Sequence, residues 1–113
     1  MVAVTVVLSS SICLKQRHWC VIVENKEHFK QTTDSTSNSV YTFGSHGVKH
    51  NFCKTCGISV FADCNIEGMG EFFAVCINVI DDLTPEQLDV LQVNYTNGKD
   101  NDWFAPPAIT KYL

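Results

Sequence analysis

Short apolar stretches rich in β-branched and aromatic residues recur along the chain, and polar segments separate them. Stretches of this length and composition, bounded by turn-forming residues, are typical of β-strands. The ranges that show the pattern are 2–8, 18–24, 40–43, 49–52, 58–62 and 72–80. The pattern predicts a mainly β fold built from antiparallel strands.

One segment has a convincing helix start, and it begins at Thr84. Thr84 can cap the helix, Pro85 suits its first position, and Gln87 follows the cap at the spacing that a capping box requires. Leu88 and Leu91 would then share one face of the helix. The sequence therefore predicts one short helix among the strands.

Several segments have the composition of turns and loops. Residues 31–39 are almost wholly Thr, Ser, Asp and Asn, which predicts an exposed loop. Residues 45–47 predict a hairpin connection, residues 97–98 (Asn-Gly) a tight turn, and residues 106–107 (Pro-Pro) an extended final segment. Because no repeat or linker divides the chain, we expect a single domain over residues 1–113.

The charge balance and the apolar runs bear on the partners of the chain. The 8 basic and 12 acidic residues give a net charge of -4, which argues against nucleic acid and against an anionic membrane surface. The longest apolar run, residues 2–8, is far shorter than the ~20 residues that a membrane helix needs. No Lys or Arg precedes this run, as a secretory signal would require. We expect neither nucleic acid nor a membrane as a partner.

The six cysteines are unevenly spaced, and two of them form a C-x-x-C pair followed by glycine. A disulfide framework in a small secreted protein usually shows many cysteines spread through the chain, whereas a close pair of this kind points to metal or redox chemistry. An intracellular, reducing setting is therefore favoured. The expected location is the cytoplasm, with the nucleus as the alternative.

The C-x-x-C pair, Cys53 and Cys56 with Gly57 behind it, is the feature that carries the most chemistry. Two such thiolates can bind one tetrahedral ion, because the turn between them brings both sulfurs to the same side and a glycine permits the tight backbone. A thioredoxin-like redox pair and two unrelated core cysteines are the alternatives. Metal is favoured, because the pair lies between two strand-like stretches and does not begin a helix. For Cys20 and Cys76, which lie in apolar stretches, we expect burial without a ligand role.

The residues around this pair, called the knuckle (residues 53–57) below, resemble a known family. The likeness is carried by Tyr41-Thr42-Phe43-Gly44 and by Lys49-His50-Asn51-Phe52-Cys53-Lys54-Thr55-Cys56-Gly57-Ile58, with support from Ser11-Ile12-Cys13 and from residues 97–103. These segments are similar to the family that joins glutathione-dependent formaldehyde-activating enzymes and centromere protein V. The resemblance extends from about residue 9 to residue 103.

The resemblance implies an Mss4-like fold, or β-tent, with a structural zinc site and a catalytic zinc site of three cysteines. Family members complete the structural site with an N-terminal Cys-x-Cys, which this chain lacks. At the catalytic positions the chain has Leu8, Ser10 and Cys13, so Cys13 alone carries over as a ligand and catalytic candidate. This is the pattern of a shortened or degenerate member. Lys15 and Arg17 would then attract the carboxylates of glutathione, with a solvated basic turn as the alternative.

Three functions follow as hypotheses. By resemblance, the chain is related to carbon-sulfur lyases that condense formaldehyde, or another small aldehyde, with glutathione to S-hydroxymethylglutathione, with zinc held by Cys53, Cys56 and Cys13. Zinc would lower the pKa of the bound thiol and polarise the aldehyde. The second hypothesis is a non-catalytic, zinc-stabilised module that binds a protein partner, which the missing ligands favour. The third, a methionine sulfoxide reductase-like oxidoreductase, rests only on the tripeptide Cys76-Ile77-Asn78.

Overall fold

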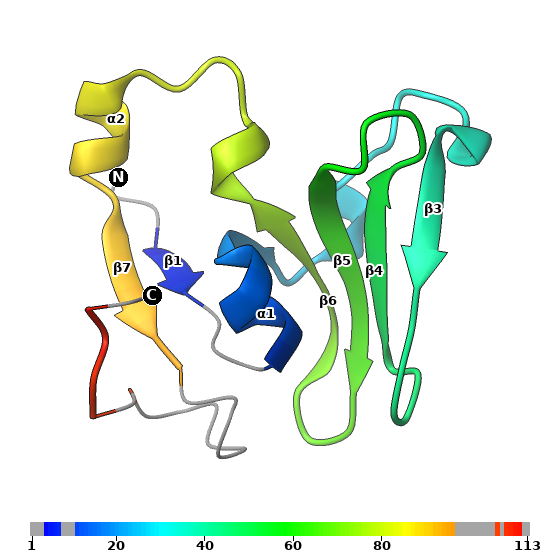
Figure 1. Cartoon of the computed structure of the whole chain (residues 1–113), viewed down its shortest axis with the longest axis horizontal. Coiled ribbons are helices and arrows are strands. Elements are labelled where there is room, and N and C mark those ends of the chain that lie inside the picture. The colour runs from blue at the N-terminus through cyan, green and yellow to red at the C-terminus, as the bar shows by residue number, and fades with distance from the viewer. Residues whose placement is uncertain (1–3, 8–10, 97–105, 107, 112–113) are drawn as a thin grey trace. The chain divides into compact units, whose positions relative to one another are not determined.

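The computed structural model describes residues 4–7, 11–96, 106 and 108–111, and strands dominate this part of the chain (Figure 1). The strands are β1 (Val4–Val7), β2 (Trp19–Val23), β3 (Asn38–Tyr41), β4 (Val48–Cys53), β5 (Ser59–Ile66), β6 (Gly70–Cys76) and β7 (Gln92–Tyr95). The helices are α1 (Ser11–Gln16) and α2 (Pro85–Asp89), with single 3-10 turns η1 (Lys26–His28), η2 (Ser35–Ser37) and η3 (Ile77–Val79). The prediction of a mainly β fold is confirmed.

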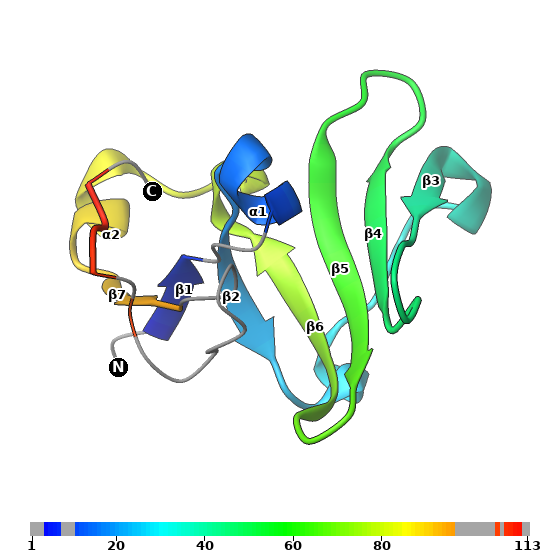
Figure 2. The same cartoon turned by 60° about the horizontal axis from the view of Figure 1, so that its bottom comes forward.

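Two compact units make up the chain: residues 22–76, and residues 1–21 together with 77–113. In the first unit, β3, β4, β5 and β6 lie in that order, and each pairs with the next in antiparallel fashion (Figures 1 and 2). The second unit contains β1, which pairs with β2 and β7. The single domain expected over residues 1–113 stays a prediction.

The loop between β3 and β4 is a hairpin connection, as residues 45–47 predicted. Strands β3 and β4 pair from Tyr41 opposite His50 to Asn38 opposite Cys53. The turn is closed by the His46 N–H, which donates to the Phe43 carbonyl at 3.0 Å. Since the β3–β4 pairing is uninterrupted, His50 and Cys53 project from opposite faces of β4, and the His50 side chain is not aimed toward the knuckle.

A β-bulge disturbs the pairing of β4 with β5 close to the knuckle. Asn51 lies opposite Phe61, but the next residue, Phe52, lies opposite Ser59, so the register shifts there. A bulge increases the local twist and redirects the strand. It lies immediately before Cys53, where β4 ends, and so helps to set the direction in which the chain enters the knuckle.

Aromatic side chains fill the space beneath η1 in the unit of residues 22–76. The Phe29 ring lies 4.4 Å from the Phe73 ring and 4.8 Å from the Phe61 ring, centre to centre. Lys26 forms an ion pair with Asp63 and lies over the Phe73 ring. These contacts fix η1 against β5 and β6 and give this small unit an apolar core.

The unit of residues 1–21 and 77–113 differs from the expectation in two details. Strand β1 pairs antiparallel with β2 but parallel with β7, so its pairing is mixed. A second helix, α1, follows β1, where the sequence predicted a metal-binding motif instead of a helix. Strand β7 was not predicted, because its alternating residues, Gln92-Val93-Asn94-Tyr95, are half polar and its four residues give a weak signal.

The predicted helix start at Thr84 is confirmed in detail. The Gln87 N–H donates to Thr84 Oγ1 at 3.2 Å, and the Thr84 N–H donates to Gln87 Oε1 at 2.9 Å. Both halves of the capping box are therefore present, and Pro85 occupies the first turn. Among the described residues, no helix is long and apolar enough to cross a membrane. The segments 97–105 and 107 lie outside the described residues, so the predicted turn at 97–98 and the family-like tail are not seen.

Candidate metal centre

The knuckle is a tight loop that begins where β4 ends and leads into β5. The Gly57 N–H donates to the Cys53 carbonyl at 2.8 Å, and the Cys53 N–H donates to the Ile58 carbonyl, also at 2.8 Å. Gly57 has a φ of 80°, in the left-handed region that residues with a side chain avoid. The glycine predicted from the sequence is therefore required by the backbone of this loop.

The Cys53 sulfur lies at the centre of a ring of hydrogen-bond donors. The backbone N–H groups of Cys56 and Thr55 donate to it, followed in strength by the Cys56 thiol and, more weakly, by the Gly57 N–H. These donors lower the pKa of Cys53 below its ordinary value and outweigh the opposing effect of partial burial. The loop therefore stabilises a thiolate at Cys53 before any ion is bound.

The two knuckle sulfurs face one another and are open to solvent. Cys56 donates its thiol hydrogen to Cys53, which places both sulfurs on the same side of the loop. Cys56 is exposed and Cys53 is half-buried, and no disulfide joins them. Two converging thiols with an accessible side are what a tetrahedral zinc ion requires of a C-x-x-C pair.

Contacts to the preceding segment hold the knuckle in place. The Lys54 N–H donates to the Ser37 carbonyl at 3.2 Å, and the Lys54 ammonium donates to the Thr36 carbonyl at 3.2 Å. Nearby, the Asn38 amide donates to the Asn51 side chain. The polar loop predicted over residues 31–39 thus continues into a 3-10 turn, η2, and a short strand that brace the site.

The other predicted site residues lie in the other unit. Cys13 lies in α1 with 4% of its surface exposed, and Lys15 and Arg17 lie exposed at the end of that helix. The structure thus brings Cys53 and Cys56 together, while Cys13 with Lys15 and Arg17 forms a separate local group. Leu8 and Ser10, the other family-like ligand positions, lie outside the described residues.

The knuckle offers a pair of ligands instead of a full set. Over the part of the chain that the structure describes, no group of three or more His, Cys, Asp or Glu side chains could hold a metal ion. The expected burial of Cys20 and Cys76 is confirmed, with 2% and 7% of their surfaces exposed, and Cys64 is buried as well at 4%. The donor set that fits zinc here is the Cys53 and Cys56 thiolate pair, with further ligands supplied from elsewhere.

A cavity that the sequence did not reveal lies in the unit of residues 1–21 and 77–113. It has a volume of about 420 Å³, and its lining residues are Val7, Arg17, Trp19, Asn78, Val93 and Tyr95. These residues are scattered through the sequence and come together only through the β1–β2 and β1–β7 pairings. One local signal was available, since Arg17 follows directly after a short helix.

Comparison with known proteins provides a likeness of fold. No protein-family model matches the chain, and no curated protein matches it. A crystal structure of a Rhodobacter sphaeroides protein, from a structural genomics programme, is similar with a TM-score of 0.65 and 19% sequence identity over 80% of each chain. At this identity, the likeness concerns the fold alone.

Proposed function

We propose that this chain is a zinc-binding β domain in which Cys53 and Cys56 supply two thiolate ligands. The observation that carries the proposal is the ring of N–H donors around the Cys53 sulfur together with the Cys56 thiol that points to it. A metal ion competes with a proton for each sulfur, so a loop that lowers the pKa of Cys53 also favours metal binding at neutral pH. An ordinary pair of core cysteines has no need of such donors or of an exposed partner thiol.

By resemblance, the domain is related to carbon-sulfur lyases that act on glutathione and formaldehyde or another small aldehyde. Zinc, when bound, would supply the acidity that converts a thiol into a nucleophilic thiolate. The chain would contribute Cys53 and Cys56 as ligands, and Cys13 as the third thiol that the family pattern requires. A reducing location in the cytoplasm or nucleus fits this use of thiols.

The burial of Cys13 favours a second candidate, a zinc-stabilised module that binds a protein. A thiol that is 4% exposed has little access to a small substrate. Strand β3 and its loop expose apolar side chains, with Val40 at 53%, Tyr41 at 51% and Phe43 at 45%. The Tyr41 and Phe43 rings stack at 5.7 Å, which makes a continuous apolar surface of a kind that proteins bind.

Metal analysis of four proteins tests the zinc proposal. The original chain is expected to retain zinc through purification, whereas Cys53→Ser and Cys56→Ser are expected to lose most of it. Cys64→Ala removes a buried thiol outside the knuckle and is the matched control, which should keep its zinc. Zinc content that is equal in the knuckle variants and the control would contradict the proposal.

Turnover of glutathione and formaldehyde then separates the two candidates. A zinc-dependent rate that Cys13→Ser abolishes, with zinc content unchanged, would support the lyase. Zinc binding without turnover would support the interaction module, and loss of partner binding in Tyr41→Ser would strengthen it. A rate that is equal in the presence and absence of zinc would contradict the lyase.

A further inference from the structure

The cavity in the unit of residues 1–21 and 77–113 combines a cation with aromatic walls. Trp19 and Tyr95 provide rings, Val7 and Val93 provide aliphatic surface, and Arg17 provides the charge. The volume of about 420 Å³ falls in the range of small-molecule sites. A mainly apolar hollow with a few polar groups is the usual form of such a site.

The backbone at Arg17 indicates that its side chain is needed there. Helix α1 ends at Gln16, and the His18 N–H donates back to the Cys13 carbonyl at 3.1 Å, which is the bond that closes a Schellman motif. Arg17 occupies the left-handed position of that motif with a φ of 53°. Glycine fills this position in most helices, because a side chain there costs free energy. Retention of an unfavourable residue at a cavity wall is a sign of function.

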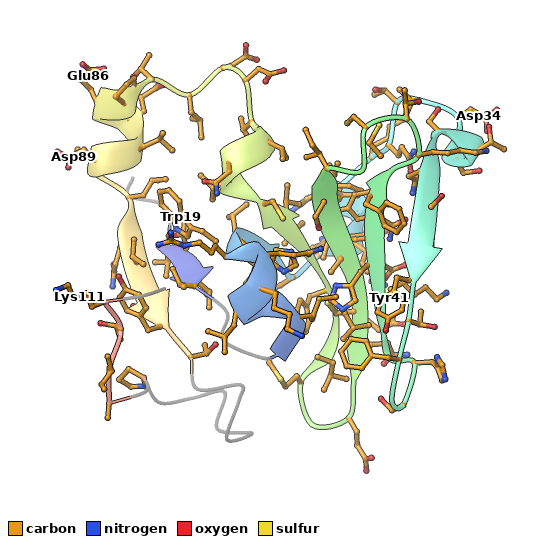
Figure 3. All side chains as sticks on the ribbon, in the orientation of Figure 1. Trp19, Asp34, Tyr41, Glu86, Asp89 and Lys111 are labelled. Carbon is orange, nitrogen blue, oxygen red and sulfur yellow. The ribbon has the colours of Figure 1, made fainter. Side chains whose placement is uncertain are left out.

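A buried hydrogen-bond chain fixes the Trp19 wall of the cavity. The Trp19 indole N–H donates to Thr5 Oγ1 at 2.6 Å, and the Thr5 hydroxyl donates to the Gln92 carbonyl at 2.8 Å. Thr5 has 0% of its surface exposed. Figure 3 shows Trp19 beside β1, where this contact is made. The indole ring is therefore held in one orientation, which lowers the entropic cost of stacking a ligand against it.

From these observations we propose that the cavity binds a small organic carboxylate whose apolar or aromatic body packs against Trp19 and Tyr95. A guanidinium binds a carboxylate through two parallel hydrogen bonds, and the Asn78 side chain can donate another. Of the six lining residues only Arg17 is charged, so the charge of a monoanion is balanced and that of a dianion is not. A carboxylate on an apolar body therefore suits the cavity better than a phosphate.

The inference stands independently of the zinc proposal, because the cavity and the knuckle belong to different units. Phenylacetate is the probe, and binding is measured by titration calorimetry with metal-free and zinc-loaded protein. Its neutral isostere 2-phenylacetamide and inorganic phosphate are the comparison ligands. Arg17→Gly removes the guanidinium while it relieves the left-handed backbone, so this variant is expected to fold. Lys15→Gln removes a neighbouring exposed cation that does not line the cavity.

Phenylacetate is expected to bind saturably, and Arg17→Gly is expected to weaken it by at least about tenfold, because a charged hydrogen-bond pair is lost. Arg17→Lys should recover only part of the affinity, since an ammonium lacks the fork. Lys15→Gln should change the affinity by less than about twofold. Equal binding of phenylacetamide or of phosphate, no saturable binding, or unchanged affinity in Arg17→Gly would each overturn the inference. Failure of zinc binding alone would leave these results unchanged.

Discussion

Replacement of Gly57 by alanine tests the geometry of the knuckle. Gly57 has a φ of 80°, and a Cβ built on it would meet no atom within 4 Å. The substitution therefore introduces no clash, and its effect comes from the backbone conformation alone. The Gly57 N–H also donates to the Cys53 carbonyl at 2.8 Å, so a relaxed backbone would disturb the loop that positions the sulfurs.

The expected magnitude follows from two opposing effects. An L-residue in the left-handed region costs roughly 1–2 kcal/mol. Alanine recovers about 0.4–1 kcal/mol because it restricts the unfolded chain more than glycine does. The net loss of unfolding free energy in the zinc-loaded protein is then about 1 kcal/mol, or about 4 °C in melting temperature. Because the metal-free loop is exposed and can relax, zinc binding must restore the strained conformation, which weakens the affinity by up to about fivefold.

Gly68 offers a matched control. It has a φ of 84°, and a Cβ there would also meet nothing within 4 Å, but it lies in the turn between β5 and β6. Gly68→Ala should therefore lose a similar amount of stability and keep the zinc affinity of the original chain. Urea unfolding and competition with a chelator measure the two quantities. If Gly57→Ala matched the original chain in both, the strained-loop reasoning would be refuted.

Two further predictions concern stability. Thr84→Ala removes the oxygen that accepts the Gln87 N–H and should lower the unfolding free energy by about 1 kcal/mol; an unchanged urea midpoint would contradict it. Burial lowers the pKa of His50, so the unfolded chain takes up a proton before the folded one does, and stability should fall as the pH drops below about 6.5. His50→Gln should flatten this dependence in unfolding measured from pH 8 to pH 5 (about 1.5 units either side of an ordinary histidine pKa), whereas His28→Gln, at an exposed site, should leave it intact.

Much of the fold could be predicted because its signals are local. The capping box at Thr84 and Gln87 is written in a few adjacent residues, and the structure contains both of its hydrogen bonds. Strand β7 escaped prediction because half of its residues are polar and it depends on its parallel partner β1 for stability. Helix α1 escaped because its six residues carry no clear period, and its Schellman ending has arginine where glycine is the usual signal.

The candidate sites divide in the same way. The knuckle could be predicted because Cys53, Cys56 and Gly57 are neighbours whose spacing dictates the loop. The N–H donors to the Cys53 sulfur follow from that spacing. The cavity could not be predicted, because Val7, Arg17 and Val93 meet only when three strands pair across the length of the chain. No pattern in the sequence announces such a meeting.

X-ray absorption at the zinc edge of the zinc-loaded protein tests the central claim most directly. The account predicts sulfur ligands at about 2.3 Å from the ion. The sulfur signal should disappear from the Cys53→Ser, Cys56→Ser double variant and persist in Cys64→Ala. A zinc shell of nitrogen and oxygen alone in the original chain, or a sulfur signal that survives in the double variant, would contradict the claim that the knuckle binds the metal.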